Sequence, residues 1–143
     1  MRKTTKILVT GAMAVAAMAG VSGAASANDM SALNRGQSLN PGDSIWADNI
    51  GGDVHYQLTL QTDGNLVEYR HNDGVAGASV CWSTHTNGSG ATNATYQSDG
   101  NFVLYNGGWV LWSSATKGAA GSNVNIDTEG EVWFGSTKHT GLC

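Results

Sequence analysis

The feature that most constrains the fold is a nine-residue pattern that occurs twice. QTDGNLVEY runs from Gln61 to Tyr69, and QSDGNFVLY runs from Gln97 to Tyr105, thirty-six residues later. An Asp-Gly pair flanked by alternating apolar residues indicates the turn of a β-hairpin. A turn does not explain why Gln, Asn, Val and Tyr also recur in register. The pattern therefore raises the question of a repeated binding site.

The pattern belongs to a longer repeat that begins with a tryptophan. A glycine follows each tryptophan after six residues, a polar residue after fifteen and a second glycine after eighteen. The three sets are Trp46, Gly52, Gln61 and Gly64; Trp82, Gly88, Gln97 and Gly100; and Trp112, Gly118, Asp127 and Gly130. Units of this length cannot each bury a core, so we expect three units, near residues 38–70, 71–105 and 106–143, to pack around a common axis. We expect the tryptophans to meet there, with a stacking platform for a ligand as the alternative.

Hydrophobic alternation predicts the length of the hairpin loop. A two-residue loop would place Gln61 opposite Leu66 and mix polar and apolar residues on both faces. A three-residue loop pairs Gln61 with Asn65 and separates the faces, as a sheet with one buried side requires. This register also places Gly64 at the third loop position, which favours a left-handed backbone. Across the three units it puts on the buried face Leu60, Leu66, Tyr96, Phe102, Val124, Ile126, Val132 and Phe134.

The outer face of the first two hairpins then carries Gln, Asn, Val and Tyr, with the loop Asp beside them. Gln and Asn offer both donors and acceptors, a carboxylate accepts, and a tyrosine hydroxyl does either. A neutral ligand rich in hydroxyl groups fits this mixture, whereas the Asp would repel a phosphate. The pattern requires no metal and no cofactor.

At all five positions the two segments match the QxDxNxVxY motif, and the chain resembles the bulb-type (monocot, snowdrop-like) mannose-binding lectins. The resemblance extends from about Leu39 to GSTKHTG near the end of the chain. It implies an all-β fold, the β-prism of type II, in which three antiparallel four-stranded sheets are related by pseudo-threefold symmetry. It also implies shallow pockets that bind α-mannose.

The resemblance assigns a role to each motif residue. Asp and Asn would bind the axial O2 of mannose, Gln would reach O3, Tyr would reach O4, and Val would pack against C3 and C4. The predicted mannose-binding residues are Gln61, Asp63, Asn65, Val67 and Tyr69 in the first hairpin, and Gln97, Asp99, Asn101, Val103 and Tyr105 in the second.

The third hairpin departs from the motif. NIDTEGEVWFG has Asp127, Glu129, Glu131, Trp133 and Gly135 where the family has Gln, Asp, Asn, Val and Tyr. Three acceptor-only carboxylates cannot donate to a sugar hydroxyl, and crowded like charges repel. We predict that this hairpin is retained for the fold and lost for mannose. The carboxylates lack the loop spacing of a calcium site, so we expect a solvated acidic face and no metal.

The first 27 residues have the three parts of a secretory signal peptide. Basic residues in MRKTTK precede an apolar run that ends near Gly20, and Ala25-Ser26-Ala27 supplies a small-residue cleavage site after Ala27. A transmembrane anchor is the alternative, but the run is shorter than the roughly 18 to 20 apolar residues that spanning needs. We therefore expect residues 28–143 to form a single secreted lectin domain without membrane insertion.

The charge of the chain argues against nucleic acid as a partner, and its two cysteines predict a disulfide. Removing residues 1–27 takes away three basic residues and no acidic one, which leaves 4 basic against 11 acidic residues, a surface that repels nucleic acid. In an exported chain Cys81 and Cys143, the two cysteines present, are expected to form a disulfide. The alternative is an intermolecular bridge, since lectins of this resemblance often form homodimers by exchanging C-terminal strands.

The sequence predicts a secreted lectin that recognises mannose or mannose-containing glycans through two sites. The alternative is a lectin-like bacteriocin on the same fold, which growth inhibition without sugar competition would identify. An enzyme is not predicted. A glycosidase needs two carboxylic acids across a deep cleft, and the acidic residues here lie on separate hairpins or in one crowded cluster. The four histidines show no ligand or triad spacing.

Overall fold

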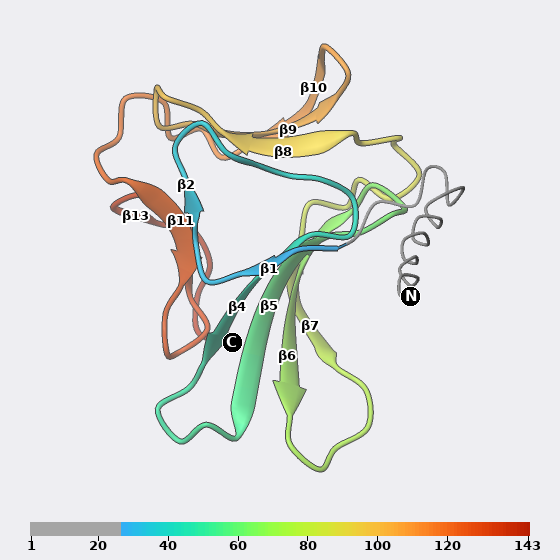
Figure 1. The fold of residues 1–143 in the computed structure, drawn as a ribbon, viewed down its shortest axis with the longest axis vertical. Coiled ribbons are helices and arrows are strands. Elements are labelled where there is room, and N and C mark those ends of the chain that lie inside the picture. Colours follow the sequence, from blue (N-terminus) through green and yellow to red (C-terminus); the bar gives the residue numbers. More distant parts are fainter. Residues whose placement is uncertain (1–26) are drawn as a thin grey trace, which may run out of the picture.

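Three β-sheets make up the part of the chain that the computed structural model describes, residues 27–143 (Figure 1). The predicted signal peptide lies outside these residues, apart from Ala27. Among residues 27–143 no helix has the length and apolar character needed to cross a membrane. The strands are β1 (Asp29–Met30), β2 (Leu33–Asn34), β3 (Ser38–Leu39), β4 (Ser44–Asp48), β5 (Val54–Leu60), β6 (Leu66–Asn72), β7 (Ser79–Ser83), β8 (Asn93–Tyr96), β9 (Phe102–Asn106), β10 (Trp109–Ser113), β11 (Asn123–Ile126), β12 (Val132–Phe134) and β13 (Thr137–Lys138).

The sheet topology confirms the predicted three-sheet prism. The strand orders are β1-β4-β5-β6-β7, β10-β9-β8-β3 and β13-β12-β11-β2. Each sheet is built on one of the three hairpins, and the N-terminal strands β3 and β2 complete the second and third sheets. The first sheet has one strand more than predicted, because β1 pairs in parallel with the edge strand β4. The carboxylate of Asp43 holds this segment by accepting a hydrogen bond of 2.9 Å from the backbone amide of Asn28.

The hairpin register is the one that the alternation predicts. Leu60 pairs with Leu66, and the backbone amide of Gln61 donates to the carbonyl oxygen of Asn65 at 2.8 Å, which leaves a loop of three residues. The third loop residue has a left-handed backbone, with φ of 91° at Gly64, 91° at Gly100 and 77° at Gly130. The predicted inward-facing residues are all buried, so the three hairpins turn their apolar faces to one core.

The prediction that three tryptophans meet at the axis is wrong for one of them. The rings of Trp82 and Trp112 lie 5.5 Å apart in an edge-to-face contact, and both contact His139. An irregularity in β7 and another in β10 turn these two tryptophans toward the core side. Strand β4 has no such irregularity, and Ile45 takes its buried side, so Trp46 points to the outer face.

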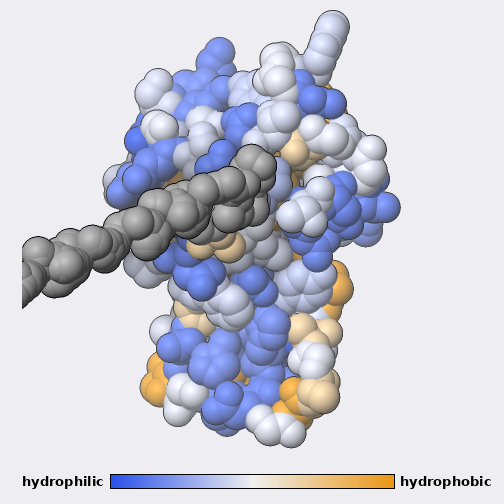
Figure 2. All heavy atoms as spheres, turned by 45° about the vertical axis from the view of Figure 1, so that its right-hand side comes forward, coloured by the Kyte–Doolittle hydropathy of each residue, from blue (hydrophilic) through white to orange (hydrophobic). Residues whose placement is uncertain are grey.

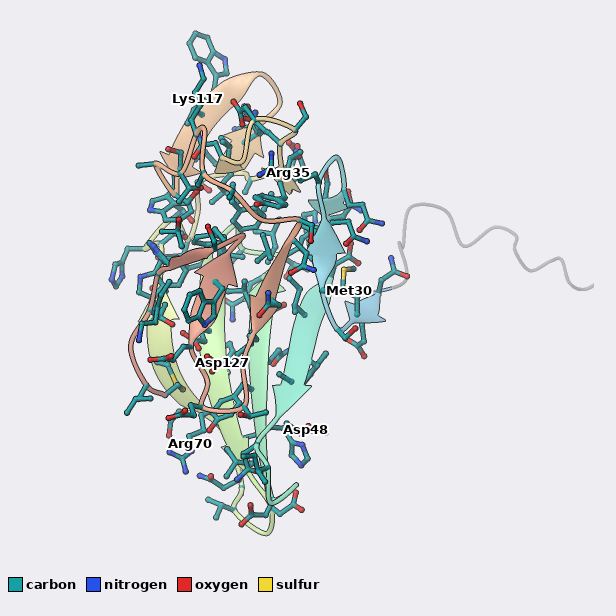
Figure 3. The ribbon with its side chains drawn as sticks, turned by 90° about the vertical axis from the view of Figure 1, so that its left-hand side faces the viewer. Met30, Arg35, Asp48, Arg70, Lys117 and Asp127 are labelled. Atoms are coloured by element: carbon teal, nitrogen blue, oxygen red, sulfur yellow. A yellow bond between two sulfur atoms is a disulfide. The ribbon has the colours of Figure 1, made fainter. Side chains whose placement is uncertain are left out.

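Two long-range connections join the sheets. Cys81 in β7 and Cys143 form a disulfide within the chain, with their Cα atoms 5.7 Å apart, as predicted. The Arg35 guanidinium donates to the carbonyl oxygens of Gly121, Ser98 and Ala119 at 2.8, 2.6 and 2.7 Å. Arg35 therefore ties the loop of the second hairpin to the segment that leads into the third sheet (Figure 3).

Candidate functional site

The first hairpin brings its five motif residues together on the outer face and loop of the first sheet. The side-chain amide of Gln61 donates to the hydroxyl of Tyr69 at 2.6 Å. Val67, in β6 with Tyr69, is only 2% exposed. In the loop, the backbone amide of Asn65 donates to a carboxylate oxygen of Asp63 at 2.9 Å. The result is a polar patch above a buried valine, framed by groups that donate and accept hydrogen bonds.

The orientation of Asn65 is fixed by a segment that follows β7. Its Oδ1 accepts hydrogen bonds from the Thr84 hydroxyl at 3.2 Å and from the Thr86 backbone amide at 3.1 Å. The Thr86 hydroxyl in turn donates to the carbonyl oxygen of Gly64 at 2.7 Å. Because its oxygen is already used, the Nδ2 group of Asn65 is the part of the side chain that remains to donate to a ligand, and the same loop carries the acceptor carboxylate of Asp63.

The second hairpin has the same hydrogen-bond pattern. Gln97 donates to the hydroxyl of Tyr105, and the amide of Asn101 donates to Asp99 at 2.9 Å. Asn101 Oδ1 accepts from the Ser114 hydroxyl at 3.1 Å and from the Thr116 backbone amide at 3.2 Å. Val103 is 3% exposed. The structure thus brings together all ten predicted residues, five on each of two sheets.

Sequence reasoning missed the threonine and serine residues that orient the two asparagines. Their signal is the spacing after the inward tryptophans, WSTHT at residues 82–86 and WSSAT at residues 112–116. The repeated glycines have a related role. The amide of Gly88 donates to the carbonyl oxygen of Asp63, and that of Gly118 donates to Asp99, both at 2.6 Å. The repeat therefore encodes the support of each loop as well as the loop.

In the third hairpin the carboxylates of Asp127 and Glu131 are bonded to groups of their own sheet. Asp127 Oδ1 accepts from the backbone amides of Glu129 and Glu131, both at 3.0 Å, and Oδ2 accepts from the Trp133 indole at 2.8 Å. The Lys138 ammonium donates to Glu131 at 2.7 Å. Burial acts to raise the pKa of Asp127, but the hydrogen bonds from Glu131, Trp133 and Glu129 outweigh it and hold this pKa below its ordinary value. Figure 3 shows Asp127 on this hairpin.

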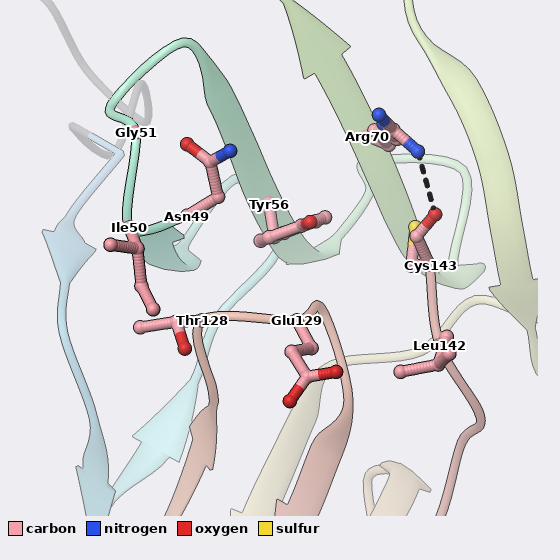
Figure 4. Close-up of a pocket in the computed structure, with 9 residues that line it drawn as sticks. All are labelled: Asn49, Ile50, Gly51, Tyr56, Arg70, Thr128, Glu129, Leu142 and Cys143. Atoms are coloured by element: carbon pink, nitrogen blue, oxygen red, sulfur yellow. Dashed lines mark hydrogen bonds between the residues drawn. The ribbon is translucent and has the colours of Figure 1, made fainter.

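A separate hollow of about 490 Å³ lies between the first sheet and the loop of the third hairpin (Figure 4). It is lined by Asn49, Ile50, Gly51, Tyr56, Arg70, Thr128, Glu129, Leu142 and Cys143. The guanidinium of Arg70, which lines this hollow, is already hydrogen-bonded within the protein. It donates to the carbonyl oxygen of Cys143 at 3.0 Å and to the Asn72 side chain at 3.1 Å. Among residues 27–143 no group of three or more histidine, cysteine or acidic side chains is arranged to hold a metal.

Glu68 is a buried carboxylate that was not predicted from the sequence. Glu68 lies on the inner face of β6, opposite Trp82, where the second hairpin has Leu104. It is fully buried, and neither carboxylate oxygen has a hydrogen-bond partner in the described structure. Burial raises the pKa of Glu68 to about 7, with a smaller contribution from the charge of Asp127, although the nearby Thr140 hydroxyl opposes the shift.

Comparisons with known proteins give one consistent set of relatives. No family model matches the chain. Curculin-2 of Molineria latifolia is 34% identical over 76 residues, which are 52% of this chain and 40% of curculin-2. A monomeric monocot mannose-binding lectin of Gastrodia elata superposes with a TM-score of 0.55 at 30% identity, over 71% of this chain and 84% of that one. The mannose-specific bulb lectin of Scilla campanulata gives a TM-score of 0.55 at 30% identity, over 70% of this chain and 80% of its own.

Proposed function

This chain belongs to the bulb-type, monocot mannose-binding lectin family, and we propose that it binds mannose-containing glycans at two sites. As a member of this family it is a carbohydrate-binding lectin. We name the outer patch of the first hairpin the first mannose site and that of the second hairpin the second mannose site. The observation that carries the proposal is that both hairpins fix the asparagine oxygen from behind, so that Nδ2 remains to donate to a ligand, and that the same loop carries an aspartate bonded to the backbone amide of that asparagine.

A donor and an acceptor side by side can bind one sugar hydroxyl from both sides, because a hydroxyl also donates and accepts. In the first site Asp63 and Asn65 form this pair for the axial O2 of mannose. Gln61 and Tyr69, already bonded to each other, meet the next hydroxyls, and Val67 packs against the apolar side of the ring. Each patch is shallow, so we expect a single mannose to bind at about millimolar affinity, or ~4 kcal/mol. Two sites on separate sheets gain avidity on branched glycans.

The third hairpin is excluded from the proposed sites. The Asp127 carboxylate accepts hydrogen bonds from its own turn and from Trp133, and the Glu131 carboxylate accepts one from Lys138. The proposal also includes secretion, which is supported by the signal-peptide pattern of residues 1–27.

Calorimetric titration of the exported protein with methyl α-mannoside tests the two sites. Asn65→Ala and Asn101→Ala should each reduce the number of sites from two to one, and the double variant should lose binding. Asn125→Ala is the matched control, because Asn125 lies on the third sheet, where its amide bonds Asn123. If the double variant binds mannan as well as the parent, the site assignment is wrong.

A further inference from the structure

The first sheet extends beyond the other two. Strands β5 and β6 have seven residues each, whereas β8, β9, β11 and β12 have between three and five. This extension forms the lower part of the molecule in Figures 1 and 2. Hydrophilic side chains cover most of its visible face in Figure 2, with hydrophobic ones at its margins. The outer face of the first sheet therefore continues past the first mannose site.

A series of rings leads away from the first mannose site along this outer face. The ring of Tyr69, which belongs to the site, lies 6.2 Å from the ring of His71, and His71 lies 5.3 Å from Trp46. Strand pairing places Tyr69, Gln57 and Trp46 in one row across β6, β5 and β4. Two strand spacings are about 10 Å. Trp46 is thus within reach of a second sugar attached to a mannose in the first site.

Hydrogen bonds hold these rings in place. Gln57 donates to the Ser44 hydroxyl at 2.9 Å, and its Oε1 lies 3.0 Å from His71 Nε2. The Trp46 indole donates to a carboxylate oxygen of Asp29 at 2.8 Å. Rings that are already ordered lose little conformational freedom when a ligand packs on them, which favours binding.

Trp46 also lines an open hollow. The hollow has a volume of about 340 Å³, and its other lining residues are Asp29, Met30 and Ser31, from and beside β1. An aromatic side chain with a few polar groups around it is the usual lining of a small-ligand site. Trp82 and Trp112 pack against the core, so their area is used for the fold, whereas Trp46 is on the outer face.

At the second mannose site the positions that correspond to His71 and Trp46 carry no ring. Two residues beyond Tyr105 the chain has Gly107, in the position that corresponds to His71. In the register of the second sheet, Asn40 follows β3 at the position of Trp46, and its side chain bonds Asp43 at 3.2 Å. The two sites share their mannose motif and differ in what adjoins it.

We propose that the first mannose site continues into a second sugar subsite formed by His71, Trp46 and Asp29, and that the second mannose site does not. The subsite takes the next hexose of an α-mannose-containing oligosaccharide. Trp46 and His71 pack against the apolar face of this hexose, and Asp29 accepts from its hydroxyls. This inference rests on the proposed function, because it needs a mannose in the first site.

The test compares the two sites in one protein. Asn101→Ala removes the second site, so that binding reports on the first site alone, and Asn65→Ala does the reverse. Each variant is titrated with methyl α-mannoside and with a panel of α-linked mannobioses and mannotriose. At the first site the best oligosaccharide should bind roughly tenfold tighter than the monosaccharide, the equivalent of about 1.4 kcal/mol. At the second site we expect no such gain.

Removing the ring identifies the source of the gain. Trp46→Leu in the Asn101→Ala background keeps an apolar side chain, and His71→Ala is a second, independent variant. Both should abolish the oligosaccharide gain and leave the affinity for methyl α-mannoside unchanged. An equal gain at both sites, or a gain that survives both variants, overturns the subsite. Failure of both sites to bind methyl α-mannoside instead overturns the proposed function.

Discussion

The first and third hairpins share a backbone and differ in how their polar side chains are engaged. In both, the first motif position bonds the backbone of the fifth across a three-residue loop, at 2.8 Å from Gln61 to Asn65 and 3.0 Å from Asp127 to Glu131. In the first, the Asn65 oxygen accepts from Thr84 and Thr86, so the Nδ2 group remains to donate to a ligand. In the third, Asp127 is bonded to its own turn and to Trp133. The buried side of a hairpin maintains the fold, so the outer side can lose a binding site without loss of structure.

The loops also differ in what holds them from behind. The loop carbonyl of Asp63 accepts from Gly88, a residue in mid-chain, whereas that of Glu129 accepts from the amide of Cys143 at 3.3 Å. Cys143 is bonded to Cys81 in the first sheet. The third hairpin therefore depends on the disulfide in a way that the first does not.

The largest effect is expected from removing this disulfide. Cys81→Ala with Cys143→Ala should lower the free energy of unfolding by about 4 kcal/mol, because the bond closes a loop with a sequence separation of 62 residues. Urea denaturation measures the loss. Amide hydrogen exchange should quicken more in the third hairpin than in the first. Equal acceleration in both hairpins would mean that the disulfide does not support the third one specifically.

Gly135, the third hairpin's counterpart of Tyr69, is the next most sensitive position. It has φ of 62°, and a Cβ there would overlap the carbonyl oxygen of Ala120. Gly135→Ala should therefore cost about 3 to 4 kcal/mol, from the left-handed backbone and the overlap together. Gly107→Ala is the control, because Gly107 has φ of 59° with open space around it, and should cost only about 1 to 2 kcal/mol. Equal melting temperatures for the two variants would show that the overlap is relieved. If Gly135→Ala melts at a lower temperature than Gly107→Ala, the overlap persists, and a tyrosine at position 135, as the motif requires, would not fit.

Glu68 is the next test, and it compares the first hairpin with the second, which has Leu104 at this position. Burial raises the pKa of Glu68 from 4.5 to about 7, so the folded chain favours the protonated acid. Its contribution to stability is greatest below pH 4.5 and is lost as the pH rises to 7. Glu68→Leu should therefore raise the free energy of unfolding by about 3 kcal/mol at pH 8 and by much less at pH 4. Thermal denaturation at both pH values measures the difference, and an equal change at both would contradict the assignment.

Side-chain periodicity made much of the fold predictable. The alternation around Gln61 and Asn65 fixes the loop length, because a shift of one residue would expose every apolar side chain of the strand. The same alternation does not predict which way the tryptophans point, because the irregularities in β7 and β10 change the direction of the residues that follow them. The repeat treats Trp46, Trp82 and Trp112 alike, yet Trp46 faces outward because β4 pairs regularly with β5.

What could not be predicted depends on contacts between distant segments. Thr84 and Thr86 orient Asn65 from nineteen and twenty-one residues away, and β1 joins the first sheet beside β4. These two cases are decided by which segments the fold brings side by side, and a local pattern does not specify that. Glu68 differs from them: its charge favours an exposed position, but the alternation with Leu66 already places it on the inner face, where it is buried.

The smallest expected effect concerns the ion pair between Lys138 and Glu131 at the third hairpin. The hydrogen bond from Lys138 to Glu131 raises the pKa of the ammonium above its ordinary value of 10.5. Lys138 is about half exposed, whereas Glu131 is largely buried. Glutamine keeps the size of the side chain and an oxygen that can accept from the ammonium, so Glu131→Gln should change the melting temperature little. The pKa of Lys138, measured by NMR of its Nζ group, should fall toward the ordinary value. If this pKa does not move, Glu131 is not held by Lys138 in solution and its carboxylate is free to face a ligand. The contrast between the first and third hairpins would then rest on Asp127 and Trp133 alone.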